Sequence, residues 1–216
     1  MRVPSVFLYL HGFASSPAGR KIALLREAFA PDGIEVLAPN LNRPSFERLD
    51  FGAMADEAVR AATGAKPAVV IGSSLGALVA LEAARRGVTA PLVLVAPALG
   101  FGPRWTDKLA PGDPVRFFHH GAGKELSIHR RFFEQMAKVD VDREPPPTRV
   151  TIVMGEKDES VPFESVRETW RRWEASGRLI PGSRFLTIPG GDHGLVDHVP
   201  TIASAIREAG NIIPPR

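Results

Sequence analysis

The sequence contains no cysteine among its 216 residues. Disulfides, thiolate metal ligands and a cysteine nucleophile are therefore excluded. The absence suits a reducing compartment, although secreted proteins can also lack cysteine. Long apolar runs are missing as well, because no stretch approaches the roughly 18 apolar residues that a membrane helix needs. With 44% hydrophobic and 24% charged residues, the composition is that of an ordinary globular protein.

The start of the chain has little of a secretion signal. Residues 1–10 carry one positive charge and a short apolar stretch, Val6–Leu10. They lack the longer apolar region and the small-residue cleavage site of a signal peptide. We therefore expect a cytoplasmic protein with no membrane partner.

Net charge is also small, since 27 Lys and Arg residues against 24 Asp and Glu residues leave +3. The arginines include scattered pairs of a kind typical of solvated helix faces, at 85–86, 130–131 and 171–172. A nucleic-acid binder more often shows a dense basic stripe with exposed aromatic residues. We expect no nucleic-acid partner, and the sequence leaves the oligomeric state open.

What the sequence does contain is a regular alternation of short apolar runs and amphipathic segments. The apolar runs predict buried strands at residues 6–10, 36–37, 68–71, 92–95, 150–154 and 184–188. The amphipathic segments predict helices at residues 18–30, 51–62, 75–86, 163–175 and 199–209. Continuous apolar strands separated by helices indicate a parallel sheet that is buried on both faces.

Together these elements predict an α/β fold, a three-layer α/β/α sandwich with a mostly parallel sheet of about six strands. Residues 1–216 are expected to form a single domain, because no other segment is large enough to fold alone. Crossovers between parallel strands are right-handed, so helices cover both faces. Ligands bind such sheets beyond the carboxyl ends of the strands, which directs attention to the loop after each strand.

One segment, residues 97–149, breaks the alternation as an insertion between the fourth and fifth strands. It begins rich in Gly, Pro and aromatic residues, predicts a helix over about residues 126–139, and returns through three prolines at 145–147. Insertions of this length are more often functional than idle, and we expect a small lid. Its aromatic residues are candidates for lining a substrate pocket: Phe101, Trp105, Phe117 and Phe118. The alternative is that they only pin the insertion onto the sheet.

The loop after the third predicted strand reads GSSLG at residues 72–76, a G-x-S-x-G pattern. The pattern is common by chance, but a buried strand precedes it here and a helix follows it, as a nucleophile elbow requires. Such a strained turn exposes the hydroxyl of its central serine, Ser74, at the edge of the sheet. Two alternatives stand beside this interpretation: Ser74 only caps the helix, or Ser73 is the nucleophile.

The loop after the first predicted strand, His11-Gly12-Phe13, is a candidate part of an oxyanion hole. In the elbow arrangement one amide donor belongs to the residue after the serine, Leu75, and the second to this loop. We assign the second donor to Phe13, and Gly12 lets the chain turn close to the site. His11 is expected to hydrogen-bond within its loop, because the order Ser, Asp, His places the base late in the chain.

Two later loops supply candidates for an acid and a base. Asp158 follows the fifth strand, and an acid there accepts a hydrogen bond from an imidazole and stabilises the imidazolium. His193 lies in the glycine-rich loop after the last strand and is the candidate base. Glu156 and Glu159 are rivals for the acid that are expected to be solvated loop charges. Asp192 is a further rival, although adjacent side chains on a tight loop rarely face each other.

Motifs for cofactors and metals are missing. There is no H-E-x-x-H pattern, no P-loop lysine motif and no dinucleotide fingerprint. His119 and His120 are adjacent, so their side chains would diverge on a regular element. We expect neither a cofactor nor a metal.

These features follow the strands in the required order, and with them the chain resembles the α/β-hydrolase superfamily. It is similar in particular to small bacterial single-domain serine esterases that open with a strand and LYLHGFASSP and later carry GSSLG. Like those esterases, it lacks the two N-terminal strands of the full superfamily pattern. The resemblance covers nearly the whole chain and implies ester hydrolysis without a cofactor.

The expected reaction is therefore cleavage of small carboxylic esters through an acyl-enzyme, with Ser74, Asp158 and His193 as the catalytic triad. A thioesterase or a small-peptide amidase would use the same residues. A non-catalytic binding protein of the same fold is a further alternative, although such proteins usually lose a triad member. The sequence does not identify the natural substrate.

Overall fold

A sheet of six parallel strands forms the centre of the computed structural model, which describes residues 5–100, 102–106, 109 and 111–212. The strands lie in the order β2-β1-β3-β4-β7-β8. Their bounds are Val6–Leu10 for β1, Glu35–Leu37 for β2, Val69–Ser73 for β3, Leu92–Val95 for β4, Val150–Gly155 for β7 and Arg184–Ile188 for β8. The strands β3, β4 and β7 are buried along their whole length, which explains their continuous apolar runs.

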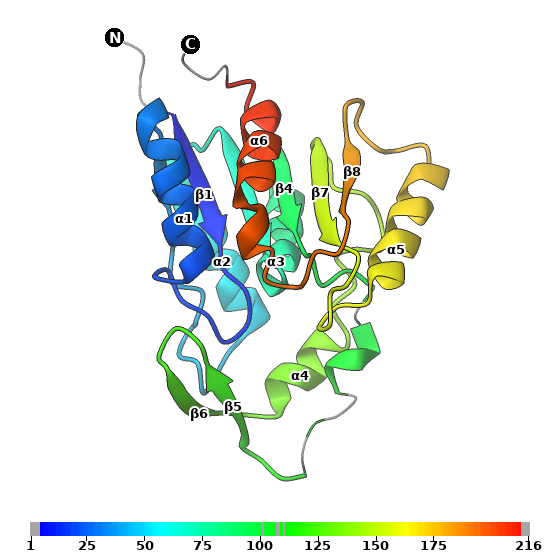
Figure 1. The fold of residues 1–216 in the computed structure, drawn as a ribbon. Helices are drawn as coiled ribbons and strands as arrows, with labels where there is room; N and C mark the ends of the chain where they lie inside the picture. The colour runs from blue at the N-terminus through cyan, green and yellow to red at the C-terminus, as the bar shows by residue number, and fades with distance from the viewer. Residues whose placement is uncertain (1–4, 101, 107–108, 110, 213–216) are drawn as a thin grey trace.

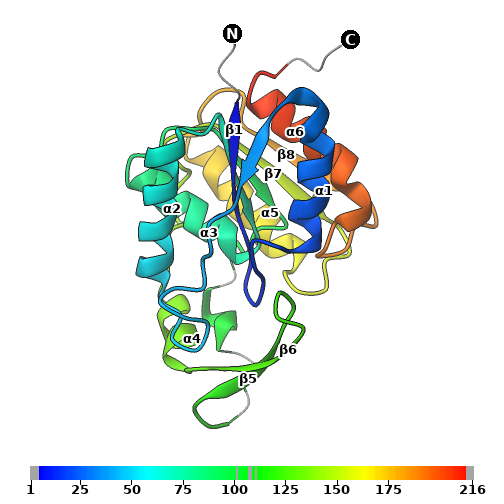
Figure 2. The ribbon, with the colours of Figure 1, turned by 90° about the vertical axis from the view of Figure 1, so that its left-hand side faces the viewer.

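Helices cover both faces of this sheet (Figure 2). α1 (Arg20–Phe29) and α6 (Val199–Ala209) lie on one face, while α2 (Phe51–Ala65) and α3 (Leu75–Arg85) lie on the other. α5 (Phe163–Ala175) packs against β7, and short 3-10 turns form η1 (Ala30–Asp32), η2 (Gly102–Trp105) and η3 (Val196–His198). The α/β/α sandwich that the apolar pattern predicted is confirmed. In the part of the chain that the structure describes, no helix is both long and apolar enough to cross a membrane.

The insertion lies beyond the carboxyl ends of the strands (Figure 1). It contains an antiparallel hairpin of β5 (Val115–His119) and β6 (Lys124–Ile128), followed by the short helix α4 (Arg131–Met136). The helix predicted over residues 126–139 is therefore wrong in its first part. Lys, Glu and Leu favour a helix locally, but pairing across the turn that ends at Gly123 (φ 65°) decides the structure of this segment.

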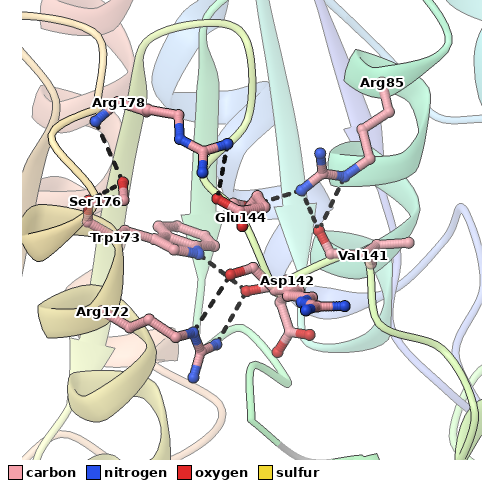
Figure 3. Close-up of polar contacts among 9 residues, drawn as sticks. Arg85, Val141, Asp142, Glu144, Arg172, Trp173, Ser176 and Arg178 are labelled. Carbon is pink, nitrogen blue, oxygen red and sulfur yellow. Dashed lines mark hydrogen bonds and ion pairs between the residues drawn. The ribbon is translucent and has the colours of Figure 1, made fainter.

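The C-terminal end of the insertion is held between two helices, whose side chains donate hydrogen bonds to its backbone carbonyl groups (Figure 3). Arg85 of α3 donates to the Val141 carbonyl at 2.8 and 3.1 Å and to the Glu144 carbonyl at 2.6 Å. Arg172 and Trp173 of α5 donate to the Asp142 carbonyl at 3.1 and 2.9 Å. These contacts join α3 and α5 through residues 141–144, the carbonyl clamp.

The same clamp also reaches the start of the insertion. The Asp142 carboxylate accepts a hydrogen bond from the Gly100 amide at 2.6 Å. Because the two ends of the insertion meet at Asp142, the hairpin and α4 form a loop that is closed at its base. The segment that leaves the sheet after β4 and the segment that returns to β7 are therefore joined to each other.

Candidate active site

Ser74 occupies a strained turn between β3 and α3. Its backbone has φ 53° and ψ −116°, a conformation that costs free energy for a residue with a side chain. The Ser74 amide donates to the Val95 carbonyl at 3.0 Å, which ties the turn to β4. The side chain does not cap α3, so the interpretation of Ser74 as a simple helix cap has no support in the geometry. Ser74 is partly exposed, and Ser73 beside it is buried.

Glycines around this turn are required by close backbone approach. A Cβ on Gly72 would lie 2.6 Å from the Cα of Ala77, and a Cβ on Gly76 would overlap the Leu10 carbonyl. A Cβ on Gly12 would lie 3.2 Å from the Cβ of Ser74. The loop after β1 is thus pressed against the serine, and the G-x-S-x-G spacing has a steric cause.

Asp158 and His193 form a hydrogen-bonded pair. Asp158 follows β7, His193 follows β8, and Oδ2 of Asp158 lies 2.8 Å from Nδ1 of His193. Oδ1 of Asp158 accepts the amides of Ser160 and Val161 at 2.9 and 2.7 Å. The Asp158 side chain is fully buried, whereas 24% of the His193 side chain is exposed. A fixed and buried carboxylate therefore orients an imidazole that stays partly exposed.

The rival carboxylates have other roles in these two loops. Asp192 accepts the Leu195 amide at 2.7 Å, and Glu159 accepts the backbone amide of His193 at 3.2 Å. Glu156 is exposed. The loops are also joined directly, since the Lys157 amide donates to the Gly191 carbonyl at 2.9 Å. Among the four carboxylates considered, Asp158 is thus the one whose oxygen meets the imidazole ring.

The two amides assigned to an oxyanion hole are available. Within the described residues, neither the Phe13 amide nor the Leu75 amide donates to a backbone carbonyl. His11 fixes the loop after β1, which carries the Phe13 amide. Its Nδ1 donates to the Gly12 carbonyl and its Nε2 accepts the Leu41 amide, each at 3.0 Å. Burial lowers the pKa of His11, which favours the neutral ring that these contacts need.

The ring of Phe13 lies at the centre of an aromatic cluster between the sheet and the insertion. Its centroid is 5.3 Å from Phe117 and 6.4 Å from Trp105. Three further rings that sequence reasoning missed surround it at 5.7, 6.1 and 5.7 Å: Phe46, Phe132 and Phe133. We call these six rings the Phe13 cluster. The two adjacent phenylalanines of α4 were the one feature of the sequence that could have indicated this cluster. Their positions along the chain, however, do not show that they pack against the loop after β1.

The other two aromatic candidates of the insertion lie elsewhere. Phe118 is 53% exposed and its ring faces His120, because neighbouring residues of β5 point to opposite faces of the strand. Phe101 lies outside the described residues. For metals, no group of three or more His, Cys, Asp or Glu side chains within the described ranges is placed to hold an ion.

The sequence profile of the uncharacterised protein family UPF0227 matches residues 6–180. The chain belongs to this family. No curated protein matches this UPF0227 sequence. Solved structures do resemble it, and their folds are those of α/β hydrolases and esterases, which confirms the resemblance seen in the sequence.

Three of these structures illustrate the likeness. Est1E from Butyrivibrio proteoclasticus, solved with ferulic acid bound, is 19% identical with a TM-score of 0.72, and the match covers 94% of this chain and 87% of that one. The esterase domain of a Rhodothermus marinus protein is 17% identical, with a TM-score of 0.68 and coverage of 97% and 87%. Mouse α/β-hydrolase domain-containing protein 10 is 16% identical, with a TM-score of 0.69 and coverage of 94% and 88%. At such identities the likeness is one of fold.

Proposed function

We propose that this protein is a serine hydrolase that cleaves small carboxylic esters, with Ser74, Asp158 and His193 as its triad. The observation that carries the proposal is the combination of a strained serine after β3 with an imidazole held at 2.8 Å by a buried carboxylate. Strain at a residue with a side chain persists where the surrounding structure enforces it, and such positions cluster at functional sites. The similarity in fold to esterases supports an esterase activity, but the argument depends on the residues of the site.

The reaction proceeds in two halves. Ser74 attacks the ester carbonyl while Nε2 of His193 takes the serine proton, and Asp158 stabilises the imidazolium that forms. The oxyanion of the tetrahedral intermediate is bound by the Phe13 and Leu75 amides. His193 protonates the leaving alcohol to give the acyl-enzyme, and it then activates water to release the acid.

The insertion, residues 97–149 of a single domain, is proposed to act as a small lid that bears on acyl-chain preference. Trp105 and Phe117 meet Phe13, whose amide is the proposed oxyanion donor. A substrate bound at that amide therefore lies beside the Phe13 cluster. Because the insertion is short and closed at its base, the pocket is expected to favour short or medium acyl chains over long lipids.

Labelling with a fluorophosphonate tests the nucleophile. The parent protein should be labelled at Ser74, and Ser74→Ala should lose both the label and activity by on the order of 10³-fold or more. Ser204→Ala, which removes an exposed hydroxyl on α6, serves as the control and should keep both. Label that persists in Ser74→Ala would show that another residue, with Ser73 the first candidate, is the nucleophile.

A substrate panel separates the chemical alternatives that share this triad. Esters, thioesters and small-peptide amides of one acyl group are compared by kcat/KM. The proposal expects the ester to lead. A thioester or amide that leads would keep the triad and change the substrate class. A protein that is neither labelled nor active on any of them would be a binding protein of this fold.

A further inference from the structure

A cleft that has no part in the reaction described above lies between the insertion and the loop that joins β2 to α2. Its volume is about 410 Å³, within the range of about 300–1,000 Å³ that small-molecule pockets have. Four of its lining residues lie between positions 44 and 50, and the other five belong to the insertion. None of Ser74, Asp158 and His193 lines it. The cleft is therefore a separate candidate for a binding site.

Hydrogen bonds between the two segments fix the walls of this cleft. The His129 amide, just after β6, donates to the Glu47 carbonyl at 2.9 Å. Gln135 of α4 accepts the Phe51 amide at 3.0 Å through its Oε1 and donates to the Asp50 carboxylate at 3.1 Å through its Nε2. Because these contacts join the loop before α2 to the insertion, the walls are formed before any ligand binds.

Part of the lining is apolar. Leu49 and Phe132 both line the cleft and are buried, with 6% and 1% of their surfaces exposed. The ring of Phe132 also stacks on Phe13, with centroids 6.1 Å apart and an angle of 8° between the planes. Phe132 is thus shared by the cleft and the Phe13 cluster. A ligand of this cleft must present an apolar part to these two side chains.

Two arginines supply unpaired positive charge to the same cleft. Arg48 lies in the loop before α2, and Arg131 is the first residue of α4. Within the part of the chain that the structure describes, neither guanidinium has a hydrogen-bond or ion-pair partner. A guanidinium is a planar fork of N–H donors that matches the paired oxygens of a carboxylate or a phosphate. The two arginines therefore favour a ligand with an anionic group.

The two carboxylates of the cleft are engaged by other groups. Asp50 accepts one hydrogen bond from the first turn of α2 and one from α4. Asp113 accepts the Arg130 amide at 2.9 Å and lies 3.2 Å from Nδ1 of His129. These two negative charges repel an anionic ligand, and they repel a doubly charged one twice as strongly. A carboxylate, with one charge, is therefore favoured over a phosphate monoester, which carries nearly two.

We propose that this cleft is a second binding site of the protein, which takes a small monocarboxylate with an apolar body. Arg48 and Arg131 bind the carboxylate, and the apolar body packs on Leu49 and Phe132. The inference goes beyond the proposed function, because binding in this cleft requires neither Ser74 nor hydrolysis.

An NMR titration of the backbone amides with benzoate, at about pH 7.5, tests the site. Benzoate should bind saturably with a Kd on the order of 1 mM, as expected of so small a ligand. The largest shifts should fall on residues 48–50 and 129–135. Benzyl alcohol keeps the ring without the charge and should bind at least about ten-fold more weakly. Phenyl phosphate keeps the ring with nearly two charges and should bind at least about three-fold more weakly.

Variants of the two arginines identify the groups that bind the anion. Arg48→Met and Arg131→Met should each weaken benzoate binding about three- to ten-fold, and the double variant should lose saturable binding. Both residues are exposed, so the variants should keep the parent melting temperature. Arg116→Met removes an exposed arginine of β5 in the same insertion that does not line the cleft, and it should keep the parent Kd.

Several outcomes would overturn the proposal. One is a parent protein that shows no saturable shift up to about 20 mM benzoate. Another is a set of shifts centred on the loops of Ser74 and His193 that persists in the double variant, which would place the carboxylate in the proposed active site. Benzyl alcohol that binds as well as benzoate would show an apolar cleft without anion recognition. Phenyl phosphate that binds more tightly would show that the ligand class is wrong.

Discussion

At the scale of single residues, the candidate site depends on groups that hold the reactive side chains in place. Ser74 keeps its left-handed backbone because glycines at 12, 72 and 76 let three pieces of chain approach closely. Such a conformation costs of order 1–3 kcal/mol, and the surrounding contacts must offset it. Asp158 is fixed by two backbone amides before it meets His193. The chemistry therefore rests on backbone path as much as on residue type.

Asp158→Asn tests the acid. The substitution keeps the shape of the side chain but removes the charge that stabilises the imidazolium, so kcat should fall by about 10³- to 10⁴-fold while the protein stays folded. Glu156→Gln, a change at an exposed carboxylate of the same loop, should leave kcat near the parent value. Steady-state kinetics and thermal melts check both variants. Near-normal turnover in Asp158→Asn would move the acid to Asp192 or Glu159.

The pH dependence of the parent protein reports the base. His193 must be neutral to accept a proton, so kcat/KM should rise with pH as the base loses its proton. A series of buffers at constant ionic strength measures the profile. A rate that is flat between about pH 5 and 8 would exclude a histidine base.

At the scale of elements, the insertion is docked at its tip as well as at its base. A Cβ on Gly121, in the turn between β5 and β6, would lie 2.6 Å from the Cβ of Ser16 in the loop after β1. His119 at the end of β5 packs its ring 4.6 Å from Phe46, and its Nε2 lies 3.3 Å from Nδ2 of Asn42. The hairpin therefore spans the loops that follow β1 and β2.

Adjacent residues of β5 give a matched test of the proposed lid. Phe117→Ala removes a ring from the Phe13 cluster and should move the acyl-chain optimum of kcat/KM, since each buried methylene is worth about 0.8 kcal/mol. Trp105→Ala should act in the same way. Phe118→Ala removes an exposed ring and should keep the parent optimum. A panel of esters of increasing acyl length measures the optimum.

The rate of Ser74 labelling by a probe with a very small alkyl group is the control for these variants. It should be the same in all three, because such a probe does not reach the pocket wall. If Phe117→Ala and Trp105→Ala keep the parent optimum, or only unfold, the aromatic residues pin the insertion and the lid proposal fails.

The carbonyl clamp at residues 141–144 offers a second test at this scale. Arg172→Met removes donors to the Asp142 and Arg143 carbonyls, and the free energy of unfolding should drop by about 1 kcal/mol because both contacts are near the surface. Arg171→Met removes an exposed ion pair with Glu164 and should change the free energy of unfolding by less than about 0.5 kcal/mol. Urea unfolding measures both. Equal effects would mean that the clamp does not stabilise the fold.

At the scale of the whole molecule, two buried histidines link stability to pH. Burial lowers the pKa of His11 and of His119 below the ordinary value of 6.5. The unfolded chain therefore binds more protons than the folded one as the pH drops below 6.5. The part of the free energy of unfolding that depends on these two neutral rings should be fully present above that pH. It should decline as the pH falls toward the lowered pKa values.

Urea unfolding at about pH 7.5, 6.5 and 5.5 checks this expectation. His119→Gln should be less stable than the parent at the highest pH, because its ring contacts are lost, and should lose less stability on acidification. His120→Gln changes an exposed neighbour and should keep most of the parent pH dependence. A parent protein with constant stability over this range would contradict the prediction.

Much of the fold could be read from the sequence because it depends on local patterns. A strand that is buried on both faces needs a continuous apolar run, and an amphipathic helix needs its apolar residues at helical spacing. These requirements placed the six strands, and they also placed GSSLG between β3 and α3. The role of the glycines in that turn could be predicted for the same reason, since only a residue without a side chain permits the close approach of the neighbouring backbone.

Contacts between distant segments could be settled only by the tertiary structure. Lys124–Ile128 has residues that suit a helix, and pairing with β5 makes it a strand. Four carboxylates were candidates for the partner of His193, and the paths of the loops after β7 and β8 bring Asp158 to it. The Phe13 cluster has the same origin. Each depends on where two loops meet in space, and no spacing along one segment encodes that distance.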